Sequence, residues 1–278
     1  MKLDRPLLAL RSAWAVVELR GPRAADYLQG QITQDVARAA ADRLTLAALL
    51  TPQGKAVCDL WFAPEGDEGW LLIVPACARE EACARLRRFS LGYTLTIAPS
   101  ARRLWSLQGP GSRALARGLD HAWPQAEAAD EGVWIVAVEQ PELAGVERVD
   151  EEIIERGRIL RGIPRFGVDW SGYPLNAGLI ERGGVSFDKG CYVGQEVTSR
   201  MRWRGAIRKR ICRLALDGPA PALPAPLCSG QAEVGRMTSA ADDGAGGAIG
   251  IAQLPIELLD RGARLTLADG RPVEVVDS

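Results

Sequence analysis

One short segment concentrates reactive and hydrogen-bonding side chains. Residues 184–197 read Gly-Val-Ser-Phe-Asp-Lys-Gly-Cys-Tyr-Val-Gly-Gln-Glu-Val, which places a lysine, a thiol, a phenol, an amide and a carboxylate close together. A nearby cation lowers the pKa of a thiol and favours the nucleophilic thiolate. Lys189 and Cys191 are therefore the candidate catalytic residues of the chain.

The same segment carries groups suited to binding a flat heterocycle. Gln195 and Glu196 supply an amide and a carboxylate, which together can read the pyrimidine edge of a pterin by complementary hydrogen bonds. Tyr192 offers a flat face for stacking. The alternative interpretation makes Cys191 a small buried hydrophobe, Tyr192 a core aromatic and the glycines ordinary turns.

The composition limits which other sites the chain can hold. Its six cysteines form no C-x-x-C pair, so a self-ligated iron–sulfur cluster is disfavoured, although distant residues could still converge. His121 is the only histidine, which removes most histidine-based zinc sites, and we predict no metal site. A formal net charge of -1 argues against a generic nucleic-acid binder.

The first residues do not resemble an export signal. Asp4, Arg5 and Pro6 stand where a signal peptide would have its apolar core. No stretch approaches the ~18 uninterrupted apolar residues of a membrane span. We therefore expect a soluble, cytoplasmic protein without membrane contact.

Two stretches of the chain resemble each other and predict a duplicated α+β unit. Residues 14–30 and 103–118 each read as a strand, a Gly-Pro turn and a helix. In the first unit we expect strands at 45–50, 56–62 and 70–74 and a helix at 78–89. In the second we expect a strand at 133–138 and a helix at 150–160, and both units place helices on an antiparallel sheet.

The pattern changes after the second unit. The proline-rich stretch 218–226 reads as a loop or short linker, and short alternating segments follow it up to the Asp269-Gly270 hairpin signal. We expect an all-β barrel that begins near Ala206. The predicted domains are residues 1–100, 101–204 and 205–278, with interleaving allowed between the first two.

The run Lys189-Gly-Cys-Tyr-Val-Gly-Gln-Glu196 resembles the signature of the YgfZ family, relatives of the glycine-cleavage T-protein, an aminomethyltransferase that uses tetrahydrofolate. Other stretches agree in the family's order: 27–36, 49–55, 161–164 and 186–187. The resemblance implies two ferredoxin-like α+β domains and a C-terminal antiparallel β-barrel around a central folate channel. It implies tetrahydrofolate or a derivative as cofactor, with Trp14 at an aromatic position associated with folate and Cys191 as the signature cysteine.

Two departures from the family pattern bear on chemistry. A second family tryptophan falls near Ile154, which leaves an apolar wall without an indole. The T-protein's catalytic aspartate would fall within residues 75–81, where no aspartate stands, and Glu80 and Glu81 read as exposed residues of a helix start. Aminomethyl transfer is therefore not predicted.

The basic stretch 200–210 follows the signature directly. It could hold a folate glutamate tail, contact RNA phosphates or simply be a solvated strand face. Within it, Arg200 is the candidate ligand contact. By resemblance we expect a folate-binding accessory protein that supports assembly or repair of iron–sulfur enzymes, including those that modify tRNA. The alternatives are a folate-dependent one-carbon transferase, with Cys191 as its reactive group, and a non-enzymatic tRNA-binding module.

Overall fold

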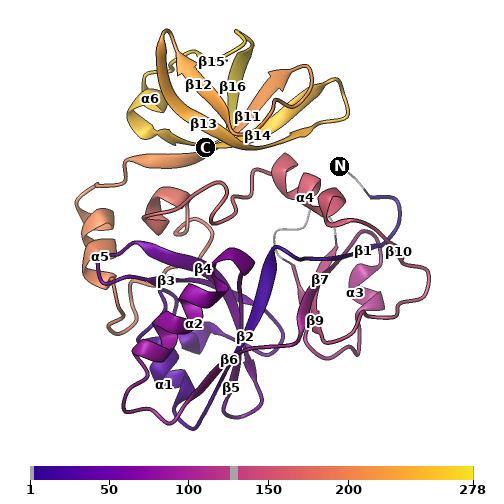
Figure 1. Ribbon diagram of the computed structural model, residues 1–278, viewed down its shortest axis with the longest axis vertical. Helices are drawn as coiled ribbons and strands as arrows, with labels where there is room; N and C mark the ends of the chain where they lie inside the picture. Colours follow the sequence, from indigo (N-terminus) through magenta and orange to yellow (C-terminus); the bar gives the residue numbers. More distant parts are fainter. Residues whose placement is uncertain (1–2, 126–130, 278) are drawn as a thin grey trace.

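The computed structural model describes residues 3–125 and 131–277. Two sheets lie next to each other, and a closed barrel caps one end of the pair (Figure 1). Helix α4 (Glu151–Leu160) lies between the barrel and the second sheet, packing on strands of both (Figure 1). The segment that connects α4 to the barrel runs along the first sheet and ends in α5 (Gln195–Trp203).

The first sheet has the strand order β3-β4-β5-β2-β6 and is antiparallel. Successive residues of each strand point to opposite sides of the sheet. One side packs on the helices α1 and α2 around the fully buried Tyr27 and Phe62. The elements are β2 (Trp14–Arg20), α1 (Ala24–Gln29), η1 (Val36–Arg38), β3 (Thr45–Leu50), β4 (Ala56–Glu65), β5 (Gly69–Pro75), η2 (Ala76–Ala78), α2 (Arg79–Arg88) and β6 (Thr96–Pro99).

The second sheet has the strand order β10-β1-β7-β9-β8. Strand β1 falls within the 1–100 range expected for the first unit, yet it pairs with β7 and β10 of the second sheet. The N-terminal strand thus crosses to the second sheet before β2 begins, an arrangement that the predicted division allowed. The elements are β1 (Leu7–Leu10), β7 (Arg103–Gln108), α3 (Ser112–Leu115), β8 (Ala122–Pro124), β9 (Gly132–Ala137) and β10 (Glu147–Arg148).

The other side of the first sheet is covered by two different partners. Over β2, β4 and β5 it packs on the second sheet, with Ile73 and Leu71 against Trp134 and Leu104. Over β3 it packs on the connecting segment that contains η3 (Pro174–Ala177) and α5. This sheet is therefore buried on both sides, which is why β3 to β5 read as nearly continuous apolar runs.

The C-terminal region closes into a barrel in the order β11-β14-β13-β12-β15-β16. Two sequence interpretations are corrected here. The proline-rich stretch 218–226 is not only a loop, because β12 begins within it at Ala225. The basic stretch 200–210 is not a strand face throughout, because Arg200 to Trp203 form the last turn of α5. The elements are β11 (Lys209–Asp217), β12 (Ala225–Ser229), β13 (Ala232–Asp242), β14 (Gly247–Pro255), α6 (Ile256–Asp260), β15 (Leu265–Leu267) and β16 (Pro272–Asp277).

The structure thus confirms the α+β class with a C-terminal antiparallel barrel. The expected strands at 45–50 and 70–74 and the expected helices at 78–89 and 150–160 are all present, with ends shifted by a few residues at most. Within the described ranges, no helix is long and apolar enough to cross a membrane.

Candidate functional site

Lys189 lies inside the protein, where its ammonium group holds a loop of the first unit. Its side chain is 8% exposed, and Nζ donates to the carbonyl oxygens of Gln29, Ile32 and Gln34 at 2.6, 2.8 and 2.9 Å. Burial lowers the pKa of Lys189 to about 8, and the charge of Asp35 opposes that shift. The amine is thus occupied by backbone acceptors, and the structure gives it a positioning role in the loop that follows α1.

The rest of the signature also docks on the first unit. The backbone N–H of Val193 donates to the carbonyl of Gly30 at 3.1 Å. Gly194 has φ +86°, and a Cβ there would meet the carbonyl oxygen of Thr51 at 2.8 Å. Three stretches that carry the sequence resemblance, at 27–36, 49–55 and 189–196, are therefore in direct contact.

Cys191 and Tyr192 have opposite environments. Cys191 is exposed, whereas Tyr192 is 6% exposed and belongs to the apolar cluster over β3. Burial raises the pKa of Tyr192 to about 12. The structure therefore leaves the thiol available to a partner or ligand, while the Tyr192 ring is occupied by core packing, as the alternative interpretation of that residue holds.

The remaining residues of the predicted site lie on α5. Gln195 begins the helix, and its side-chain oxygen accepts from the backbone N–H of Tyr192 at 3.4 Å. Glu196 and Arg200 form an ion pair at 2.6 Å on the outer surface of α5, with side chains 84% and 54% exposed. As placed, both charged groups face solvent and each other.

Trp14 lies in a separate pocket between the two sheets. The Trp134 ring is 5.6 Å from that of Trp14 and 5.4 Å from that of Trp61, measured between centroids. Ile154 of α4 closes one side, so the apolar wall expected at that position is present. The indole N–H groups of Trp14 and Trp134 are buried without a hydrogen-bond partner among the described residues. The cavity between these groups measures about 20 Å³.

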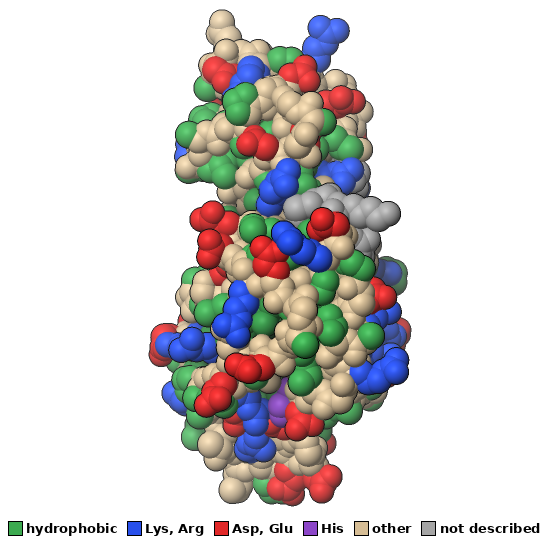
Figure 2. Space-filling model, turned by 90° about the vertical axis from the view of Figure 1, so that its right-hand side faces the viewer, with side chains coloured by type: hydrophobic (Ala, Val, Ile, Leu, Met, Phe, Trp, Pro, Cys, Tyr) green, Lys and Arg blue, Asp and Glu red, His purple; other side chains and the backbone are tan. Residues whose placement is uncertain are grey.

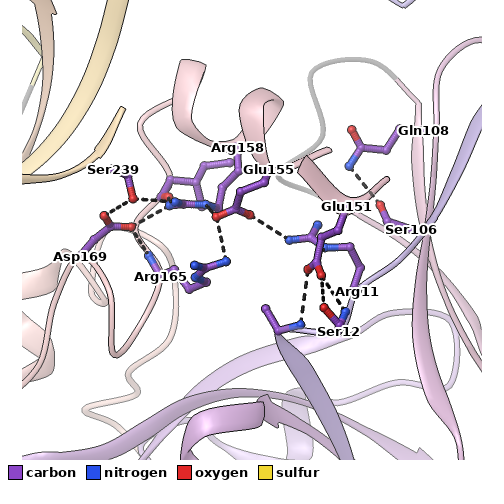
Figure 3. A network of polar contacts seen from close by, with 12 residues as sticks. Arg11, Ser12, Ser106, Gln108, Glu151, Glu155, Arg158, Arg165, Asp169 and Ser239 are labelled. Carbon is purple, nitrogen blue, oxygen red and sulfur yellow. Dashed lines mark hydrogen bonds and ion pairs between the residues drawn. The ribbon is translucent and has the colours of Figure 1, made fainter. Parts of the chain in front are cut away.

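A network of ion pairs forms the polar side of this pocket (Figure 3). Arg11 pairs with Glu151 and Glu155 of α4 at 3.1 and 3.2 Å. Although burial disfavours the charged form, the hydrogen bond from Ser12 and the charge of Arg11 lower the pKa of Glu151 below its ordinary value. Glu151 is therefore ionised at neutral pH, and the two carboxylates hold Arg11 at the edge of the pocket.

The network continues from α4 to the barrel through Arg158 (Figure 3). Its guanidinium contacts Glu155 at 2.8 Å, Asp169 at 2.7 Å and the Ser239 hydroxyl of β13 at 2.9 Å. Asp169 also accepts from the Ser239 hydroxyl at 2.5 Å and from that of Thr238 at 2.9 Å. The pocket wall and the barrel are thus joined by buried, charge-assisted hydrogen bonds.

The pocket and the signature share a wall but are distinct places. Trp61 packs against both the cluster around Trp14 and the cluster around Tyr192, and Arg182 reaches the pocket from the connecting segment. In the part of the chain that the structure describes, no side chain of residues 189–196 lines the pocket. Nor do three or more described His, Cys, Asp or Glu residues converge as a metal site.

Sequence reasoning did not find Trp61, Trp134 or Arg158 as members of this pocket, nor Asp169 as the ion-pair partner of Arg158. Each lies in an ordinary strand, helix or loop pattern, and they converge only when the two sheets and α4 pack together. The prediction that Glu80 and Glu81 are exposed in the first turn of a helix is confirmed.

This architecture is similar to that of known proteins. The GCVT N-terminal domain model matches residues 11–148, and the CAF17 C-terminal beta-barrel domain model matches residues 208–277. The solved aminomethyltransferase T of the glycine cleavage system from Bartonella henselae superposes with a TM-score of 0.80 over 98% of this chain and 85% of that one. At 16% sequence identity, this likeness shows a shared fold.

Two curated relatives are more similar in sequence. The tRNA-modifying protein YgfZ of Escherichia coli (strain K12) is 30% identical over 236 residues, which cover 76% of this chain and 72% of that protein. The protein of the same name from Shigella flexneri matches with the same identity and the same coverage. Together with the two domain models and the shared fold, this similarity shows that the chain belongs to the YgfZ family.

Proposed function

We propose that this chain is a cytoplasmic folate-binding accessory protein that supports assembly or repair of iron–sulfur clusters and, through the enzymes that carry them, tRNA modification. The observation that carries the proposal is the pocket at Trp14, where aromatic faces, an apolar wall and buried indole donors without partners meet. Buried polar groups without partners are costly in a folded protein, so they mark a place where a ligand gains by supplying acceptors. The tRNA-modifying relatives support the second half of the proposal.

The donor set of the pocket fits a reduced pterin and its tail. Trp14 and Trp134 would offer ring faces and indole donors, and Gln108 and Gln125 would offer amides to the heterocycle. The surrounding guanidinium groups would attract the carboxylates of a glutamate tail. When bound, tetrahydrofolate would supply a carrier for a one-carbon group.

The volume of the pocket sets a condition on this binding. A cavity of about 20 Å³ holds roughly one water molecule, far below the ~300 Å³ of a small-molecule site. Folate can therefore bind only if the side chains that line the pocket move apart. Carboxylates of α4 and of the loop after it hold the guanidinium groups of Arg11 and Arg158 at the edge of the pocket. We therefore expect these two arginines and their carboxylate partners to move together.

The test is a titration of tetrahydrofolate into the full chain, followed by tryptophan fluorescence. Trp14→Phe should weaken binding about 2- to 10-fold, because it removes part of the aromatic contact and one indole donor. Trp203→Phe is the matched control: Trp203 is 72% exposed on α5, outside the pocket lining, and its variant should bind as the parent does. Saturable binding that is equal in both variants, or no binding at all, would refute the proposed pocket.

Cys191 is the proposed reactive group because its thiol is exposed within the docked signature. A strain that lacks its own family member should regain modified tRNA nucleosides when it expresses the wild-type chain. Cys191→Ala should fail to restore them. Cys77→Ala removes another exposed thiol and should restore them fully. Equal restoration by both variants would exclude the thiol role.

A further inference from the structure

The C-terminal end of α5 presents an exposed aromatic platform. Trp203 is 72% exposed, and its ring lies 6.4 Å from the ring of Phe187 at an interplanar angle of 70°. The guanidinium of Arg202 lies over both rings, 4.5 Å from the centroid of Phe187 and 5.0 Å from that of Trp203. A tryptophan this exposed leaves most of its ring available to a partner.

Positive side chains lie within and directly after this end of the helix in the sequence. Arg202, Arg204, Arg208 and Lys209 are all exposed, and none of them has a described carboxylate at ion-pairing distance. Arg200, one turn earlier, is instead neutralised by Glu196. We call Phe187, Arg202, Trp203, Arg204, Arg208 and Lys209 the α5 patch. It is a local concentration of uncompensated cations on a chain whose formal net charge is -1.

The face that carries the second sheet is different. There, acidic and basic side chains are interspersed (Figure 2). A mixed surface has little field at a distance, whereas a cluster of one sign attracts an opposite charge. The α5 patch therefore differs from that face in sign balance as well as in its exposed aromatic ring.

We propose that the α5 patch binds RNA directly, with an unpaired base stacked on Trp203 and the neighbouring phosphates paired with the arginines. Stacking on an aromatic ring within a positive groove is the common mode of single-stranded nucleic-acid binding. The core of a protein interface would surround Trp203 with apolar area. The group recorded over its ring is instead the guanidinium of Arg202. This contact goes beyond the proposed function, in which tRNA is reached only through client enzymes.

The position of the patch also places RNA near the thiol. Phe187 is four residues before Cys191, and four residues span at most about 14 Å. The backbone positions of Phe187 and Cys191 are therefore no more than about 14 Å apart. An RNA strand on the α5 patch would lie within reach of Cys191.

The test measures binding of the full chain to a fluorescein-labelled 12-nucleotide single-stranded RNA by anisotropy. Trp203→Ala should raise Kd about 5- to 150-fold, the range of one lost base stack. Trp203→Phe keeps an aromatic face and should retain most of the affinity. Because Trp203 is exposed, both variants should unfold thermally as the parent does, and tetrahydrofolate binding should be unchanged in both.

A salt titration separates the charge contribution from stacking. The slope of log K against log salt should become shallower by about 1.4 in Arg204→Gln/Arg208→Gln, since each lost single-strand phosphate contact contributes about 0.7. Arg113→Gln/Arg117→Gln makes the same charge change at exposed positions by α3 and should leave the slope unaltered.

The results either support or overturn the proposal. RNA binding that is weakened by Trp203→Ala and by the Arg204/Arg208 variant, but not by the control pair, supports it. No measurable RNA binding, or binding that both patch variants retain, overturns it. If polyglutamate of equal charge competes as well as RNA does and Trp203→Ala has no effect, the patch receives an acidic surface and the RNA proposal is wrong. Because folate binding is measured on the same variants, failure here is distinct from failure of the Trp14 pocket.

Discussion

Replacement of Lys189 by methionine separates a positioning role from a role in activating the thiol. The substitution keeps an unbranched side chain but removes the ammonium that donates to three carbonyl groups at 2.6 to 2.9 Å. If the group positions backbone, its loss leaves buried acceptors without donors. If it activates Cys191, its loss slows the reactions of the thiol instead.

The structure sets the size of the expected effect. Hydrogen bonds to a charged group contribute about 1.5–3 kcal/mol each, or about 4.5–9 kcal/mol for the three. The lowering of the pKa of Lys189 from 10.5 to about 8 corresponds to a burial cost of at most about 3.5 kcal/mol, and less where solvent still screens the charge. We therefore expect Lys189→Met to lower the free energy of unfolding by about 2–5 kcal/mol.

Guanidinium denaturation measures that loss, and peptide-level alkylation of Cys191 with iodoacetamide at several pH values measures thiol reactivity. Lys55→Met is the matched control, because Lys55 is exposed at the β3–β4 turn, and its unfolding free energy should stay within about 0.5 kcal/mol of the parent. Under native conditions the alkylation profile of Cys191 should be unchanged. If Lys189→Met is as stable as Lys55→Met while Cys191 alkylates more slowly, the positioning argument is refuted.

Three further predictions concern packing, charge burial and pH. Gly194→Ala should destabilise the fold by about 2–4 kcal/mol, against about 1 kcal/mol for Gly92→Ala, which has the same φ of +86° but open space at its Cβ. Asp169→Asn breaks a buried ion pair and should lower the free energy of unfolding by about 3–5 kcal/mol. The exposed Glu257→Gln should lower it by about 0.5 kcal/mol or less, and chemical denaturation measures both. Lys189 loses its proton at about pH 8 when folded and near 10.5 when unfolded, so its contribution makes stability rise with pH across that window, and the rise should be absent in Lys189→Met.

Each of these predictions has a contradicting result. Equal losses in the two glycine variants would mean that the backbone of the β3–β4 turn moves away from an added methyl group. A small loss in Asp169→Asn would mean that the ion pair with Arg158 contributes little to the stability of the fold. A stability that runs parallel to that of Lys189→Met between pH 8 and 10.5 would mean that the folded chain keeps the proton.

Much of the architecture follows from the sequence by itself. Periodicity predicted β3 at 45–50 to the residue, because a strand buried on both sides has a long apolar run bounded by turn residues. The duplicated strand-turn-helix units and the barrel after Ala206 follow from turn chemistry and alternation, which are local properties. The signature at 189–196 was likewise found as a dense local pattern.

The tertiary structure decided what those residues do. Lys189 and Cys191 are two positions apart, yet one is buried on carbonyls of the loop after α1 and the other is exposed, because the segment docks with one side on β3. Trp14, Trp61 and Trp134 come from three strands of two sheets and meet only because those sheets pack face to face. Sequence spacing determines which side of an element a residue occupies, whereas long-range packing determines what lies opposite it.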